Sequence, residues 1–228
     1  MSALSANANS VTILTESSDH VMVRLFLHQN TAGNLSSLLV VNTDALTFRT
    51  QYLTIDPAVF FPPGCLVVGS ASGTEATVCY NVNANTIMVT TTDSSNDASL
   101  FTISDILVGN REGTGNTSFP NQLGLSANVT AVGDAPRVLA IDGVSWSVQG
   151  PNAAIGLEFG NSTVFETVMM LSGRGYYGKN ELDAPIEPTD HAHDTNIYIS
   201  TYNVPAGGGY SITLSLRKVE GFASPPSY

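Results

Sequence analysis

Alternation of apolar and polar residues with a period of two is the feature that most restricts how this chain can fold. In residues 21–28 (VMVRLFLH) every odd position is Val or Leu, whereas Arg24 stands at an even position. Residues 211–217 (SITLSLR) and 144–148 (VSWSV) alternate in the same way. Successive side chains of a strand point to opposite faces, so each segment is predicted to be a strand with one buried face. Trp146 shares the apolar face of its segment and is therefore expected in the core.

Turn-forming residues divide the chain into short segments. The sequence contains 20 Gly and 11 Pro, and Val, Ile and Thr are abundant between them. Those β-branched residues favour strands, whereas Gly and Pro favour turns. The best helical candidate, residues 35–46, is interrupted by Ser, Asn and Thr. We therefore expect an all-β fold, an antiparallel β-sandwich of jelly-roll-like type.

One stretch is predicted to be a small β module inserted into that sandwich. Short apolar runs there alternate with Ser-Gly and Asn-rich turns, which is typical of antiparallel strands. The predicted division is a discontinuous β-sandwich at 1–55 and 113–222, an inserted module at 56–112 and a C-terminal tail at 223–228. The run at 90–99 (TTTDSSNDAS) is too polar for a core and is expected to be an exposed loop.

The charge balance argues against two classes of partner. Eight Lys and Arg stand against nineteen Asp and Glu, which gives a formal net charge of −11. A nucleic-acid-binding protein needs a basic surface to displace counterions from phosphates, and anionic membranes select for the same charge. Neither nucleic acid nor a membrane is therefore expected as a partner. The first 20 residues lack the basic and apolar regions of a secretory signal.

The chain contains two cysteines, Cys65 and Cys79. Two thiols in 228 residues do not make a disulfide framework, so synthesis in a reducing compartment fits best. A hairpin could still bring them together, and the sequence leaves that pairing open. Cys79 stands in an apolar segment and is predicted to be a small buried hydrophobic residue.

Several motifs occur in an order that resembles a known family. They are VNTDAL at 41–46, VSWSVQG at 144–150, LSGRGYY at 171–177, TNIYIST at 195–201 and the strand at 210–218. Their order resembles the virion structural proteins of tailed phages, especially phages of cyanobacteria and marine bacteria. The inserted module separately resembles a repeat that is common in phage structural proteins. The acidic segment 181–194 departs from the family pattern, and the family often lacks the inserted module.

The resemblance implies a structural component of a virion, assembled in the host cytoplasm, most simply a capsid decoration or cement protein. Two alternatives stay open: a tail, collar or baseplate protein, and a carbohydrate-binding or adhesin module on the particle surface. The resemblance also implies a homo-oligomer, a trimer being common among decoration proteins, that contacts the major capsid protein or other virion proteins. No catalytic residue, no enzyme activity and no cofactor are expected.

The segment that looks most like a metal site is Asp190-His191-Ala192-His193-Asp194. Two His at i and i+2 lie on one face of an extended segment, with carboxylates beside them. A divalent cation bound by Asp190, His191, His193 and Asp194, or a His cluster on an oligomer axis, would use this arrangement. A solvated polar loop is the favoured interpretation, because a closed zinc site needs four ligands with supporting hydrogen bonds. No metal is therefore predicted.

Arg174, Tyr176 and Tyr177 are the candidate interface or ligand residues. They are predicted in a turn beside glycines, where they would pack at a subunit interface or, alternatively, stack on sugars. Glu158 and Glu166 suggest the paired carboxylates of a glycosidase. They fall in different predicted strands without supporting motifs, so ordinary surface positions are favoured for both.

Overall fold

Antiparallel strands make up most of the described chain, and the one short helix in that part is the 3-10 helix η1 (Thr43–Ala45). The computed structural model describes residues 8–29, 33–91, 101–110, 122–134, 136–161, 163–178, 184–189 and 194–223. Two compact units emerge: Met1–Thr43 with Pro136–Glu220, and Asp44–Ala135 with Gly221–Tyr228. The predicted all-β class is confirmed. Within the described ranges, no helix is long and apolar enough to span a bilayer.

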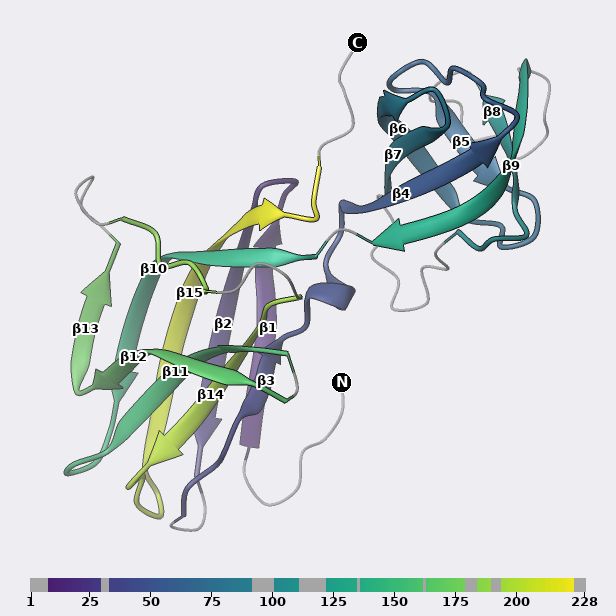
Figure 1. The fold of residues 1–228 in the computed structure, drawn as a ribbon. Coiled ribbons are helices and arrows are strands. Elements are labelled where there is room, and N and C mark those ends of the chain that lie inside the picture. Colours follow the sequence, from purple (N-terminus) through teal and green to yellow (C-terminus); the bar gives the residue numbers. More distant parts are fainter. Residues whose placement is uncertain are drawn as a thin grey trace. The chain divides into compact units, whose positions relative to one another are not determined.

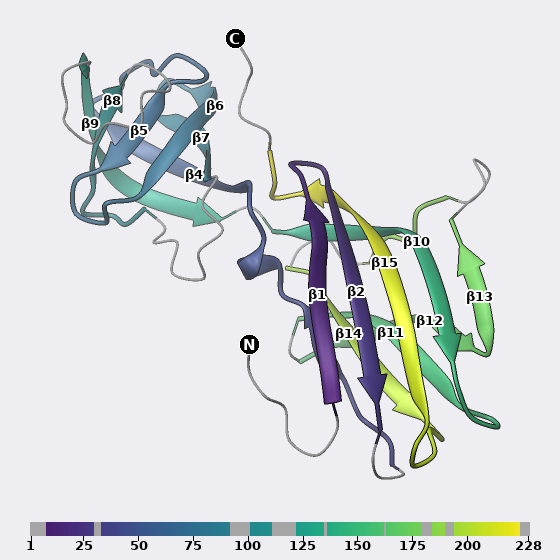
Figure 2. The same cartoon turned by 180° about the vertical axis from the view of Figure 1, so that it is seen from behind.

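The first unit consists of two facing antiparallel sheets (Figures 1 and 2). The five-stranded sheet has the order β1 (Ala8–Glu16), β2 (His20–His28), β15 (Gly209–Glu220), β10 (Val138–Val148), β13 (Arg174–Tyr177). The four-stranded sheet has the order β12 (Phe165–Ser172), β11 (Ala154–Gly160), β14 (Asn196–Tyr202), β3 (Leu38–Val41). We call this unit the sandwich.

The strands of the sandwich pair in a nested order. With β1 set aside, the first strand pairs with the last (β2 with β15) and the second with the penultimate (β3 with β14). The third pairs with the sixth (β10 with β13), and the fourth with the fifth (β11 with β12). Contacts of β15 with β10 and of β14 with β11 complete the two sheets. This is the folded-over arrangement of an eight-stranded jelly roll.

The predicted alternation is confirmed in the sandwich core. Val21, Val23, Leu25 and Leu27 of β2 are at most 2% exposed, while the residues between them are exposed. The apolar positions of β15 are buried in the same way, opposite those of β2 in register. The other sheet contributes Ile155, Leu157 and Phe159 of β11. Burial of these two apolar faces against each other is the main source of stability of the unit.

The expectation that Trp146 lies in the core was only partly right. It faces the same side of β10 as the buried Val144 and Val148, as the alternation predicts, but it is only half-buried. Its cross-strand neighbour in the edge strand β13 is Gly175, which has no side chain to cover it. The indole therefore lies at the margin of the core instead of inside it.

The second unit is a closed six-stranded barrel. Its strands follow the order β4 (Arg49–Asp56), β7 (Thr86–Thr91), β6 (Glu75–Asn83), β5 (Leu66–Gly69), β8 (Ile106–Asn110), β9 (Gln122–Asp134), and β9 pairs back with β4. Thirteen buried apolar residues fill it, among them Leu53, Phe61 and Ile87, all at 0% exposure. Closure leaves no sheet edge, because every strand has two neighbours.

The predicted boundaries of the inserted module, 56–112, were too narrow. The barrel takes up Asp44–Ala135, because β4 and β9 belong to it and not to the sandwich. Both strands alternate as sandwich strands do, and only their pairing with each other closes the barrel. The predicted start of the C-terminal tail, residue 223, is also wrong, because Gly221 and Ala223 form backbone hydrogen bonds with barrel residues. Thr50 N donates to Gly221 O at 2.9 Å, and Ala223 N donates to Phe48 O at 3.0 Å.

Two further details of the barrel bear on the sequence predictions. Thr90 and Thr91 were expected in an exposed loop, but they end strand β7 and are 0% and 1% exposed. The rest of that predicted loop, 92–99, lies outside the described residues. Cys65 and Cys79 are both free thiols. Cys65 is buried, whereas Cys79 is only half-buried, although burial still raises the pKa of its thiol to about 11.

Candidate functional site

The predicted interface residues lie on an edge strand instead of a turn. Arg174, Tyr176 and Tyr177 belong to β13, which pairs with β10 and forms one edge of the five-stranded sheet. Arg174 and Tyr176 are exposed on the outer face, Tyr176 by 53%. Tyr177 points to the opposite face, is half-buried and donates its hydroxyl to Ala184 O. Two of the three candidates therefore have exposed side chains, and the hydroxyl of the third bonds to the following segment.

Two of the sequence motifs meet across this edge. Trp146 of the VSWSVQG motif stands directly opposite Gly175 of the LSGRGYY motif. The indole lies so close that a Cβ on residue 175 would come within 2.1 Å of Trp146 Cζ2. Trp146 Nε1 also donates to Ser172 O at 3.1 Å. Both motifs are therefore explained by packing, because together they place the single Trp of the chain against the edge strand.

Asp194 is the one member of the proposed metal-binding segment that the structure describes, and it is engaged in an ion pair. Its Oδ2 accepts from Arg137 Nη2 at 2.6 Å, and its Oδ1 accepts from the backbone N of Arg137 at 2.7 Å. Asp190, His191 and His193 lie outside the described residues. Within the part that is described, no three His, Cys, Asp or Glu side chains come together as a metal site.

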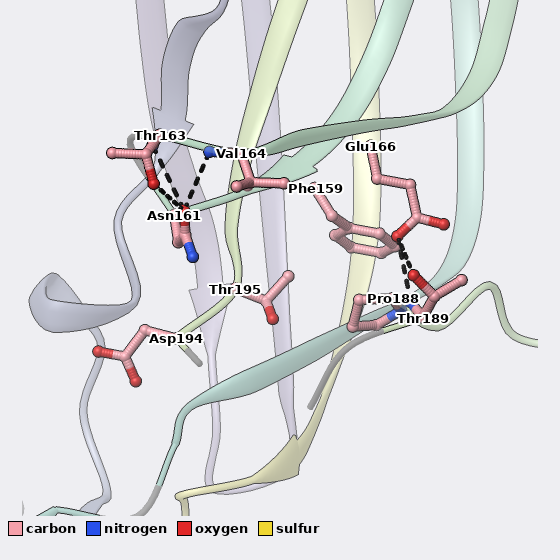
Figure 3. A pocket seen from close by; sticks show the side chains of 10 residues that line it. Phe159, Asn161, Thr163, Val164, Glu166, Pro188, Thr189, Asp194 and Thr195 are labelled. Carbon is pink, nitrogen blue, oxygen red and sulfur yellow. Dashed lines mark hydrogen bonds between the residues drawn. The ribbon is translucent and has the colours of Figure 1, made fainter. Parts of the chain in front are cut away.

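A pocket of about 320 Å³ lies at one end of the four-stranded sheet (Figure 3). Its polar groups already bond to one another. Glu166 Oε2 accepts from Thr189 N at 3.1 Å and from Thr189 Oγ1 at 3.0 Å. Asn161 Oδ1 accepts from Thr163 and Val164. Residues 190–193 lie outside the described residues, and we assign no function to the pocket.

The two glutamates that suggested a glycosidase face opposite sides of the same sheet. Glu158 stands opposite Thr167, whereas Glu166 stands opposite Phe159, one position further along. Because alternate residues of a strand point to opposite faces, the two carboxylates cannot flank one substrate. Glu166 is part-exposed, but Glu158 is only 5% exposed, so its predicted surface position was wrong.

Two other buried charges are structural. Lys218 Nζ is sealed from solvent and donates to Glu16 Oε1 at 2.7 Å and to Ser17 O at 2.9 Å. Burial lowers the pKa of Lys218, although Glu16 opposes that effect. In the barrel, burial works against ionisation of Asp105, but the N–H groups of Thr102, Ser72 and Ala71 outweigh it and lower its pKa. Neither group was identified from the sequence.

Comparisons with known proteins assign neither a family nor a function to this chain. No family model matches the chain, and no curated protein matches it. A solved structure described as "Complete structure of manganese lipoxygenase of Gaeumannomyces graminis and partial structure of zonadhesin of Komagataella pastoris" aligns with 96% of this chain and 84% of its own. Its identity to this chain is 8% and its TM-score is 0.15, which is too low to support any argument about fold or function. The class that the geometry defines is an all-β protein with a jelly-roll sandwich and an inserted barrel.

Proposed function

We propose that this protein is a structural component of a tailed-phage virion, and specifically a capsid decoration or cement protein. The observation that carries the proposal is the nested jelly-roll order of the sandwich strands. Jelly rolls occur in viral capsid and lectin domains, and most of the motifs that resemble phage virion proteins fall on strands of this one, namely β3, β10, β12, β13, β14 and β15. A fold alone does not imply a function, so the assignment rests on the fold and the motif order together.

The surface of the sandwich suits a building block that contacts neighbours. The edge strand β1 carries three exposed apolar side chains, Val11, Ile13 and Leu14, between 44% and 46% exposed. Val11 and Ile13 pair with buried residues of β2, so they lie on the core side of the sheet without full cover. A long apolar edge strand is a ready site for pairing with another chain. We therefore propose a homo-oligomer, a trimer in the simplest case, that docks on the major capsid protein or other virion proteins.

The exposed edge residues and the net charge agree with a role in binding other proteins. The exposed Arg174 and Tyr176 at the opposite sheet edge offer the aromatic and guanidinium groups that are enriched at protein interfaces. The net charge of −11 keeps free copies soluble and disfavours nucleic acid as a partner. The proposed role requires neither a cofactor nor enzyme activity.

The test is mass spectrometry of purified particles of the tailed phage that encodes this chain, followed by a cryo-EM map of the same particles. The proposal expects density for the jelly roll on the outer capsid surface, at three-fold or quasi-three-fold positions. Density on the tail, collar or baseplate would replace it with the corresponding tail role. Absence of the chain from purified particles, or a monomer of 24 kDa that binds glycans in isolation, would refute it.

A further inference from the structure

The outer face of the four-stranded sheet is unusually apolar for a solvent-facing surface. Its outward positions carry Leu39, Phe165, Met170 and Tyr202, each between 37% and 55% exposed. The outward positions of β10 and β15 in the other sheet are mostly Ser and Thr, although β2 in that sheet exposes Met22 and Phe26. The solvated face of an antiparallel sheet is ordinarily polar. An exposed apolar face of this kind marks a site of interaction.

A buried carboxylate lies at the centre of this face. Glu158 is 5% exposed, and its Oε2 accepts from Ser37 Oγ at 3.2 Å. No cation of the described chain pairs with it, whereas Asp105, the other buried carboxylate of that part of the chain, accepts from several backbone donors. Its Oε1 accepts no hydrogen bond from the residues that the structure describes, and it is not fully sealed from solvent. A desolvated carboxylate with one hydroxyl donor gains strongly from a cation.

Aromatic and sulfur-containing side chains surround that carboxylate. Gly156 stands beside it on β11, and the position of the missing Cβ is 3.2 Å from Tyr202 Cε2, 3.5 Å from Met170 Sδ and 3.6 Å from Glu158 Oε1. On the other side, Tyr198 packs edge-on against Phe165 with ring centroids 4.9 Å apart. Glycine at 156 therefore lets an aromatic ring, a thioether and a carboxylate oxygen converge on one small area.

We propose that this face docks a protein partner by receiving one arginine side chain at Glu158. A guanidinium is planar, stacks on aromatic rings and donates paired N–H groups to a carboxylate, and it is less strongly hydrated than an ammonium. Tyr202 supplies the ring, Met170 the apolar wall, and Glu158 Oε1 the acceptor. The charge of this acidic chain favours a cation over a neutral ligand. The inference goes beyond the proposed virion role and does not depend on it.

The experiment is an NMR titration of the full-length ¹⁵N-labelled protein with N-acetyl-arginine amide. Its matched ligand control is N-acetyl-citrulline amide, which has nearly the same shape without the charge. We expect saturable shifts at the amides of Gly156, Glu158 and Tyr202, and at least about tenfold weaker binding of the citrulline compound. Raised salt should weaken the arginine binding, because the contact is electrostatic.

Three variants separate the site from the fold. Glu158→Gln keeps an acceptor for Ser37 but removes the charge, and it should weaken arginine binding at least about tenfold. Gly156→Ala adds a Cβ 3.2 Å from Tyr202 Cε2 without a change in charge, and it should weaken binding as well. Glu166→Gln is the matched control, because it removes one charge from the opposite face of the same sheet and should leave binding within about twofold. Melting curves should show that all three variants still fold.

Three results would overturn the proposal. One is the absence of saturable shifts with the arginine compound, and another is equal binding of the citrulline compound. The third is unchanged binding in both Glu158→Gln and Gly156→Ala. Shifts at the same amides with methyl glucoside but not with the arginine compound would instead identify a saccharide site. None of these readouts involves the virion, so this inference and the proposed function can fail separately.

Discussion

Replacement of Gly175 with Ala tests how the edge strand is held. The new Cβ would lie 2.1 Å from Trp146 Cζ2 and 2.6 Å from Cε2, distances that real Cβ contacts do not reach. The indole must therefore move and lose its 3.1 Å hydrogen bond to Ser172 O. Loss of that bond costs about 1 kcal/mol, and the forced repacking costs about 1–3 kcal/mol more. A total of about 2–4 kcal/mol corresponds to a fall in Tm of roughly 5–15 °C for the sandwich.

The assay uses Trp146 itself, since it is the single Trp of the chain. Thermal unfolding followed by Trp emission should show the lower Tm, and the native emission maximum should shift to the red as the indole becomes more exposed. Gly133→Ala in the barrel is the control, because its nearest neighbour, Tyr52 Cβ, lies at an ordinary 3.9 Å. An unchanged Tm together with an unchanged emission maximum in Gly175→Ala would refute the close packing of these two residues.

Four more predictions concern the buried charges and the two units. Glu16→Ala removes the carboxylate that pairs with Lys218 and should lower the unfolding free energy by about 3–5 kcal/mol in urea titrations; a loss under about 1 kcal/mol would contradict a sealed pair. Burial lowers the pKa of Lys218 below 10.5, so the unfolded chain binds the ammonium proton more tightly than the folded chain does. The free energy of unfolding should therefore rise with pH in the window just below 10.5. Lys218→Met should remove that rise between about pH 8 and 10. Asp105→Asn keeps the acceptor for Ala71 and Ser72 but loses the one for Thr102, so calorimetry at pH 6 should show a less stable barrel, by about 2–4 kcal/mol. Because the folded pKa of Asp105 lies below 3.8, its contribution is present above that pH and lost as pH falls through the folded value, so variant and parent should converge in strong acid. Replacement of residues 44–135 by a short Gly-Ser linker should leave the sandwich folded with unchanged Trp146 emission, because β4 and β9 pair with each other and bring the two ends of the insertion together; a chain that no longer folds would show that the sandwich needs the barrel.

The local sequence pattern was sufficient to predict which segments form strands and which of their residues are buried. A period of two can be read from neighbouring residues alone, so the strand class and the buried positions of β2 and β15 followed from the sequence. The same pattern could not assign β4 and β9 to the barrel. Strands of a barrel and of a sandwich alternate alike, and what distinguishes them is which distant strand completes the pairing.

The candidate site depended even more on long-range register. The sequence predicted Arg174, Tyr176 and Tyr177 as partner residues in a turn; the structure exposes Arg174 and Tyr176 but half-buries Tyr177, and places all three on a strand. The sequence could not predict that Glu158 is buried, because its neighbours are Ser37 and residues of β12 and β14, which are distant in the sequence or set by register. It also could not place Trp146 at the core margin, since that depends on Gly175 lying opposite it.

The chain by itself determined an all-β protein with alternating faces, because the direction of a side chain along a strand depends only on the parity of its position. Tertiary structure decided which strands became neighbours, and with them the jelly-roll order, the extent of the barrel and the carboxylate surrounded by aromatic rings. The physical reason is that each cross-strand pair joins residues far apart in the sequence. Its energy therefore depends on the whole fold and not on any local run of residues.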